Sequence, residues 1–238
     1  MPYVTGGFPG VDAELLRALQ DSGADAIEVG IPFSDPVMDG GVIQEASRRA
    51  LEIGTHPMDV IATIGEAGLS TPVAVMTYVN PVLRRGVAGF LDEARAAGVT
   101  GIIVPDVPVD EAAELDSEAA ARGIDAVLLA APGTAPERLA AIAANARGFV
   151  YCVGSYGVTG ARTSLSSSGR EVVEALRPLT SLPLLVGVGI ATPELAAEAC
   201  AFADGVVVGS ALMERLVAGD REGFLALATD FRRGIGGP

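Results

Sequence analysis

The chain has 238 residues, half of them hydrophobic, and its 16 basic and 30 acidic residues give a formal charge of −14. This length and apolar content suit one large domain with an ample core, and we expect residues 1–238 to form a single domain. The acidic balance argues against nucleic acid or a membrane as partner, because both nucleic acids and anionic membranes select basic surfaces. No leader-like N-terminal segment and no run of about 18 apolar residues is present, so we expect a cytoplasmic protein.

The counts of single residue types restrict the chemistry. All 16 basic residues are arginine, which excludes a Schiff-base lysine, a pyridoxal phosphate anchor and a P-loop lysine. His56 is the only histidine, and Cys152 and Cys200 are the only cysteines, which argues against a zinc site and against a disulfide framework. We therefore expect no cofactor and no metal, with catalysis carried by carboxylates, hydroxyls, arginines and backbone groups.

Short apolar segments alternate with stretches of helical periodicity along the whole chain. The expected strands are residues 2–5, 25–31, 72–78, 101–104, 126–129, 149–153, 183–187 and 205–208. The expected helices include residues 11–22, 87–97, 111–122, 136–146, 170–176 and 193–201. Asp110, Thr134 and Thr192 stand where N-caps belong. Eight strands each followed by helix predict a single (β/α)8 barrel. A doubly wound sheet is the alternative, but the glycines after the first strand do not form its dinucleotide fingerprint.

One acid, Glu28, lies inside the second expected strand. Because side chains alternate along a strand, Ile27 and Val29 should pack under helices, whereas Glu28 and Gly30 should face the barrel interior, with small neighbours leaving space around the carboxyl group. Burial without a lysine partner should raise the pKa of Glu28 and make it a proton donor and acceptor near neutral pH. The alternatives are a solvated glutamate at a strand end and a glutamate paired with arginine.

Further candidates follow the ends of the strands, where barrel active sites form. Asp35 and Asp39 lie in the loop after the second strand, although both also belong to ordinary turn sequences. Glycine-rich segments follow strands six, seven and eight at residues 157–160, 187–190 and 209–211, and backbone N–H groups there favour phosphate. Tyr78 and Tyr151 at strand ends predict an aromatic wall for a flat ring. Met76, Ile103 and Leu129 on neighbouring strands face the interior and predict either contact with the same ring or core packing.

The segment from Gly30 to Gln44 reads Gly-Ile-Pro-Phe-Ser-Asp-Pro-x-x-Asp-Gly-x-x-Ile-Gln. It resembles the signature of the tryptophan synthase α subunit family, and residues 2–5, 7–10, 78–81 and 105–108 support the resemblance in the right order. The resemblance implies a (β/α)8 barrel that cleaves indole-3-glycerol phosphate to indole and glyceraldehyde 3-phosphate. This retro-aldol reaction needs neither a metal nor a Schiff base.

The resemblance also assigns roles to individual residues. Glu28 would be the main acid/base and would protonate the departing ring carbon, while Asp39 would hold the ring N–H. The implied phosphate contacts are Gly160, Val188, Gly189, Gly209 and Ser210. The implied indole wall is Tyr78, Met76, Ile103, Leu129 and Tyr151. Thr159 would close the site and orient the aspartate, and Pro32, Asp35 and Pro36 would face a partner subunit.

The sequence departs from the family pattern at several points. Family members usually begin with a helix that caps the barrel floor, whereas Met1 stands directly before Pro2, so we expect a barrel without that helix. Gly41 replaces the usual proline, which predicts a looser loop. Met38 replaces a small residue beside Asp39, and we expect it to crowd the ring.

Three functions fit this sequence. The first is an α subunit that passes indole to a tryptophan synthase β subunit in an α2β2 complex, and the resemblance of Asp35 and Pro36 favours it. The second is a free-standing lyase that releases indole. The third is a barrel that only binds a partner or ligand, and the intact Glu28 and Asp39 count against it.

Overall fold

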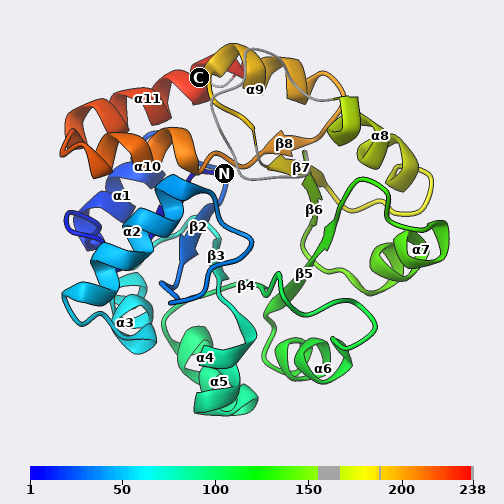
Figure 1. Ribbon diagram of the computed structural model, residues 1–238, viewed down its shortest axis with the longest axis horizontal. Helices are drawn as coiled ribbons and strands as arrows, with labels where there is room; N and C mark the ends of the chain where they lie inside the picture. The colour runs from blue at the N-terminus through cyan, green and yellow to red at the C-terminus, as the bar shows by residue number, and fades with distance from the viewer. Residues whose placement is uncertain (155–166, 188, 237–238) are drawn as a thin grey trace.

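The computed structural model describes residues 1–154, 167–187 and 189–236. Within these residues, eight parallel strands form one sheet in chain order (Figure 1). The strands are β1 (Tyr3–Thr5), β2 (Ile27–Gly30), β3 (Val73–Met76), β4 (Gly101–Ile103), β5 (Asp125–Ala130), β6 (Val150–Val153), β7 (Leu184–Gly187) and β8 (Gly205–Val206). A parallel bridge between Pro2 and Val208 joins the last strand to the first. The expected (β/α)8 barrel is therefore confirmed.

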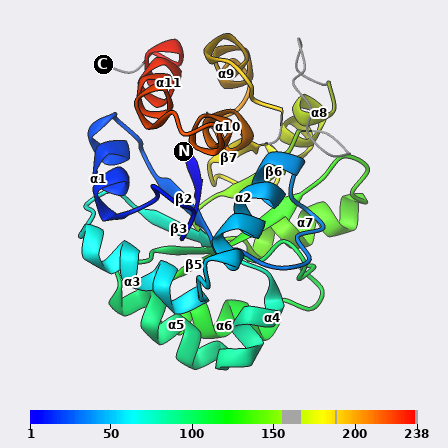
Figure 2. The ribbon, with the colours of Figure 1, turned by 60° about the vertical axis from the view of Figure 1, so that its left-hand side comes forward.

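Helices surround the strands on the outside (Figures 1 and 2). They are α1 (Ala13–Asp21), α2 (Gly41–Glu52), α3 (Pro57–Ala67), α4 (Val79–Arg85), α5 (Val87–Ala96), α6 (Ala113–Ala121), α7 (Pro136–Asn145), α8 (Ser167–Leu176), α9 (Pro193–Cys200), α10 (Ser210–Val217) and α11 (Arg221–Gly234). The β2–β3 connection carries both α2 and α3, so a whole helix separates the loop after β2 from the helix that leads to β3. In the described residues, no helix is both long and apolar enough to span a bilayer.

Only one of the three expected N-caps is present. The Thr192 hydroxyl accepts a hydrogen bond from the Leu195 N–H (3.3 Å) at the start of α9, as expected. The N-caps of α6 and α7 are instead Ala112 and Ala135. The Thr134 hydroxyl accepts from the N–H of Ala131, three residues earlier, and so stabilises the preceding turn. The expectation for Asp110 is also wrong, since its carboxylate pairs with an arginine on α7.

Strand alternation divides the side chains of β2 between two environments. Ile27, Val29 and Ile31 belong to the main hydrophobic core between strands and helices. A second, smaller cluster of apolar side chains from β3, β4, β5 and β6 forms apart from this core. Glu28 and Gly30 occupy the alternate positions of β2. The pattern expected from the sequence is therefore present on this strand.

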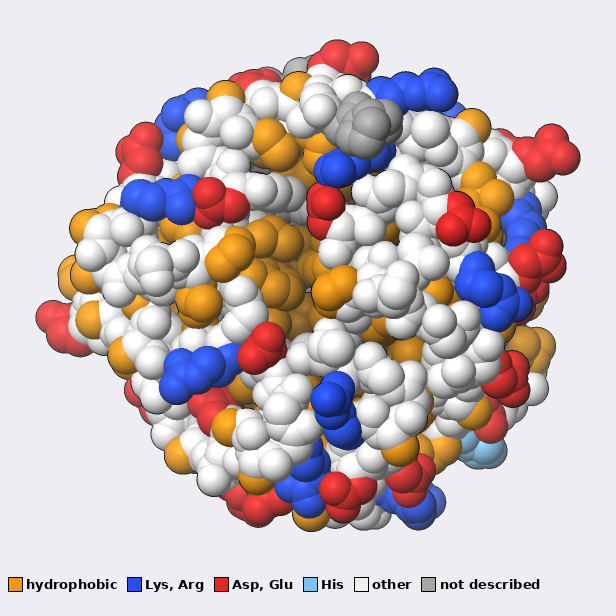
Figure 3. All heavy atoms as spheres, turned by 180° about the vertical axis from the view of Figure 1, so that it is seen from behind, with side chains coloured by type: hydrophobic (Ala, Val, Ile, Leu, Met, Phe, Trp, Pro, Cys, Tyr) orange, Lys and Arg blue, Asp and Glu red, His pale blue; other side chains and the backbone are white. Residues whose placement is uncertain are grey.

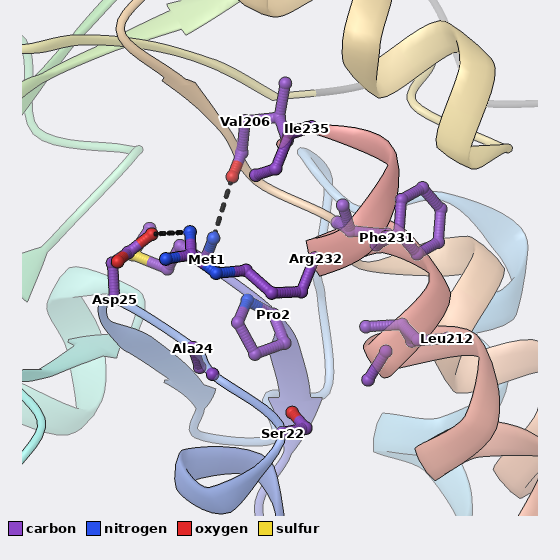
Figure 4. Close-up of a pocket in the computed structure, with 13 residues that line it drawn as sticks. Met1, Pro2, Ser22, Ala24, Asp25, Val206, Leu212, Phe231, Arg232 and Ile235 are labelled. Atoms are coloured by element: carbon purple, nitrogen blue, oxygen red, sulfur yellow. Dashed lines mark hydrogen bonds and ion pairs between the residues drawn. The ribbon is translucent and has the colours of Figure 1, made fainter. Parts of the chain in front are cut away.

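A pocket lies at the amino-terminal ends of the strands, away from the loop that follows β2 (Figure 4). Met1 and Pro2 before β1 line it, together with Asp25 before β2 and residues of α10 and α11. Its two charged side chains pair with each other, since Arg232 and Asp25 are 2.9 Å apart. On the face turned away in Figure 1, hydrophobic side chains gather in a central hollow (Figure 3). Neither Glu28 nor Asp39 lines the pocket of Figure 4.

Candidate active site

Glu28 lies on β2 between Tyr3 of β1 and Ala74 of β3 in the strand register. It is only 1% exposed, and its Oε2 atom has no hydrogen-bond partner among the described residues. No arginine in the described part of the chain forms an ion pair with it, so neither a solvated nor an arginine-paired glutamate is found. Burial, and then the nearby charge of Asp39, raise the pKa of Glu28 to about 8.

Asp39 lies in the loop between β2 and α2, and a tyrosine between β3 and α4 holds it there. The Tyr78 hydroxyl donates to Asp39 Oδ2 (3.3 Å) and accepts from the Met38 N–H (3.0 Å). The ring of Phe33 stacks on that of Tyr78, with centroids 5.0 Å apart. Burial raises the pKa of Asp39 to about 6, although the Tyr78 hydrogen bond opposes the shift.

The two carboxyl groups therefore titrate in different ranges. Between about pH 6 and pH 8, the pKa values leave Asp39 ionised and Glu28 protonated. A protonated carboxyl beside a carboxylate can give a proton to one atom and stabilise positive charge on another. The site can therefore combine proton donation by Glu28 with stabilisation of a positive charge by Asp39.

The side chains expected to form a ring-binding wall divide into two groups. Four of them pack in the smaller apolar cluster around the buried side chains of Ala74 and Val127. These four are Met76, Ile103, Leu129 and Tyr151. Burial, and then the charges of Glu28 and Asp39, raise the pKa of Tyr151. Tyr78 lies apart from this cluster and contacts the loop after β2.

The glycine segments after β7 and β8 come together because these two strands are neighbours in the sheet. Gly189 follows β7 in a left-handed conformation with φ of 91°, and Gly209 precedes Ser210, the first residue of α10. A helix start beside a glycine turn provides backbone N–H groups for an anion. The other expected contacts, Thr159, Gly160 and Val188, lie outside the described residues.

The loop expected to face a partner is only partly at the surface. Pro32 is buried, whereas Asp35 is exposed and Pro36 is partly exposed. Beyond them, the neighbouring apolar residues Val37 and Met38 are 78% and 52% exposed. About half of the Met38 residue is exposed, and its backbone N–H donates to the tyrosine that holds Asp39.

Tyr3 and Phe33 are site residues that the sequence reading missed. The Tyr3 ring lies over Gly30, where a Cβ would come within 2.7 Å of ring carbon Cε2. The space expected above this glycine is therefore filled by an aromatic ring. A glycine inside a strand often marks such a close approach, and this signal could have pointed to a large side chain on the neighbouring strand.

Barrels of this kind place their chemistry at the carboxyl ends of the strands, and Asp39 lies in the loop that follows β2, the strand that carries Glu28. The fold defines the class as a (β/α)8 barrel. The family model for the tryptophan synthase alpha chain matches residues 1–228. The chain belongs to this family.

Individual relatives agree with the family model over nearly the full chain. The tryptophan synthase alpha chain of Synechocystis sp. is 45% identical over 235 residues, which cover 96% of this chain and 89% of the relative. That of Carboxydothermus hydrogenoformans is 46% identical over 89% of this chain and 81% of its own length.

Solved structures show the same fold. Mycobacterium tuberculosis tryptophan synthase has a TM-score of 0.91 at 40% identity, and the match covers 98% of this chain and 91% of that chain. A mutant tryptophan synthase alpha-subunit from Pyrococcus furiosus has a TM-score of 0.88 at 38% identity, covering 99% and 96% of the two chains.

Proposed function

We propose that Glu28 and Asp39 carry the reaction of this family, in which indole-3-glycerol phosphate is cleaved to indole and glyceraldehyde 3-phosphate for tryptophan synthesis. The observation that carries the proposal is a buried carboxyl group on β2, with its pKa raised to about 8, near a second carboxyl that ionises lower. Family membership supports the same reaction. The chain is thus a carbon–carbon lyase.

The proposed steps use the two carboxyl groups in turn. Protonated Glu28 gives its proton to the ring carbon that carries the glycerol chain, and the ring nitrogen becomes positively charged. Asp39, held by the Tyr78 hydroxyl, stabilises that charge through the ring N–H. Ionised Glu28 then accepts the proton of the adjacent chain hydroxyl as the carbon–carbon bond breaks. Indole and the aldehyde leave, and Glu28 is protonated again.

The remaining expected residues would bind the two ends of the substrate. The apolar cluster of Met76, Ile103, Leu129 and Tyr151 supports an aromatic ring near Glu28. Gly189, Gly209 and Ser210 would bind phosphate through backbone N–H groups and the start of α10. Phosphate binding at this end of a barrel is common, and it needs no lysine.

We also propose that the loop after β2 contacts a tryptophan synthase β subunit. The adjacent exposed apolar side chains of Val37 and Met38 support a partner surface, since contiguous exposed apolar side chains mark interaction sites. This loop also carries Asp39, so a partner that orders it would raise the rate, with a coupling of about 1–3 kcal/mol. Val37→Asp should weaken activation by an added β subunit at least about fivefold and leave basal indole release unchanged. Equal activation of the variant and the parent would contradict this surface.

Indole release by Glu28→Gln tests the proposed reaction. The amide keeps the shape of the side chain but cannot donate the proton, so the rate should fall by about a hundredfold to ten-thousandfold. Binding of glycerol 3-phosphate should be retained. Glu66→Gln on the exposed side of α3 is the matched control, because it also removes one carboxylate. Near-normal turnover of Glu28→Gln would remove Glu28 from the mechanism.

A further inference from the structure

Tyr3 connects the two ends of the site, although neither proposed catalytic group contacts it by a hydrogen bond. Its Cβ and Cδ1 atoms lie against Gly209, where an added Cβ would be 3.6 and 3.5 Å from them. Its hydroxyl end lies over Gly30 on the opposite side. The ring therefore extends from the segment proposed to bind phosphate to the strand that carries Glu28.

The Tyr3 hydroxyl is displaced toward the carboxyl end of β2. Tyr3 pairs with Glu28 in the strand register, yet its hydroxyl lies at Gly30, two residues further along the strand. The hydroxyl is therefore offset from Glu28 toward the carboxyl end of β2, the end of the strand at which the loop carrying Asp39 begins.

One hydroxyl partner holds Tyr3 in this position. The Tyr3 oxygen lies 3.2 Å from Thr5 Oγ1, and both side chains are buried. Because either hydroxyl can donate, Thr5 can donate to Tyr3 while Tyr3 donates to a further acceptor. Burial, and then the charge of Asp39, keep the pKa of Tyr3 well above its ordinary value, so the phenol keeps its proton at neutral pH.

We infer that Tyr3 is a further substrate-binding residue, whose hydroxyl donates to the middle hydroxyl of the glycerol chain. This inference rests on the proposed function. The substrate carries one chain hydroxyl next to the ring, which Glu28 would deprotonate, and a second between that carbon and the phosphate. The Tyr3 ring spans a similar interval, between Gly30 on the strand that carries Glu28 and Gly209. Tyr3 would thus select a hydroxylated three-carbon chain over a plain alkyl chain.

Tyr3→Phe removes the hydroxyl and keeps the ring between Gly30 and Gly209. The test compares two ligands. For the substrate indole-3-glycerol phosphate, KM and kcat are measured. For indole-3-propanol phosphate, which has the same ring and phosphate but no chain hydroxyls, the dissociation constant is measured. Loss of one hydrogen bond should raise KM for the substrate about five- to tenfold. The dissociation constant of the propanol analogue should stay within about twofold, because that ligand offers no such acceptor.

Thr5→Val is the second variant, since it removes the partner of the Tyr3 hydroxyl at nearly constant volume. It should raise KM about two- to threefold alone and have no further effect in the Tyr3→Phe background, because the two residues act through one hydroxyl. Thr229→Val on α11 is a control that also removes one threonine hydroxyl.

The inference is overturned if Tyr3→Phe leaves KM unchanged, or if it weakens both ligands equally, because the second result would mean that Tyr3 only supports the shape of the site. Either result leaves indole release by the parent chain intact. If the parent chain releases no indole at all, the proposed function itself has failed.

Discussion

Replacing Glu28 by Gln should stabilise the protein at alkaline pH and change its stability least in acid. The carboxyl group is 1% exposed, and burial raises its pKa from an ordinary 4.5 to about 8. Between these values, the folded state keeps a proton that the unfolded chain has released. The stability of the parent therefore falls as pH rises through this range. Glutamine does not titrate, so the variant lacks this loss.

The size of the effect follows from the same two pKa values. One proton changes the free energy of unfolding by about 1.4 kcal/mol per pH unit. Over the interval from 4.5 to about 8, the cost of ionising Glu28 reaches about 4–5 kcal/mol. Between pH 5 and pH 8, the stability difference between variant and parent should therefore grow by about 3–4 kcal/mol.

Urea unfolding at pH 5, 6, 7 and 8 measures this difference, with the free energy extrapolated to water at each pH. The change with pH is the quantity of interest, because the new amide adds a constant contribution of its own. Glu66→Gln, at an exposed position of α3, is the control for the loss of one carboxylate. A stability difference for Glu28→Gln that stays constant from pH 5 to pH 8 would refute the assignment of a buried, protonated Glu28.

Two further predictions concern the loop after β2. Asp39→Asn should lower kcat at least about a hundredfold with little change in substrate affinity, because the charge on the ring nitrogen develops during the reaction. Single-turnover indole release measures the rate of the chemical step separately from substrate affinity. A loss confined to affinity would contradict the assigned role. Tyr78→Phe removes the hydroxyl that contacts both Asp39 and the Met38 N–H. The Tyr78→Phe variant should have a free energy of unfolding lower by about 1–2 kcal/mol, measured by thermal melting, and a kcat lower severalfold, measured in steady-state assays. If both quantities are unchanged, this contact does not order the loop.

Strand alternation was enough to predict the burial of Glu28. The apolar residues of β2 alternate with Glu28 and Gly30, and a parallel strand covered by helices allows only one face for each set. The same reasoning located all eight strands, since each is a short apolar segment bounded by turn residues. Periodicity is a local property, and these features depend on it alone.

Periodicity does not predict contacts between residues that are far apart in the sequence. Tyr78 binds Asp39 across 39 positions of the chain, and nothing in either local sequence specifies which tyrosine faces the loop. The Tyr3 ring fills the space over Gly30 for the same reason, since the register of β1 against β2 decides that contact. Asp110 and Thr134 suited N-caps by residue type, but α6 begins two residues later than expected, at Ala113, and α7 begins at Pro136 as expected with Ala135 as its N-cap.

The pH dependence of kcat/KM tests the central claim most directly, because it reports the protonation state in which the free enzyme works. If buried Glu28 must hold a proton for the ring carbon, kcat/KM for indole-3-glycerol phosphate should be constant around pH 7. It should then fall tenfold per pH unit above the Glu28 pKa of about 8. A value of kcat/KM that stays constant to pH 9.5 would contradict Glu28 as the proton donor.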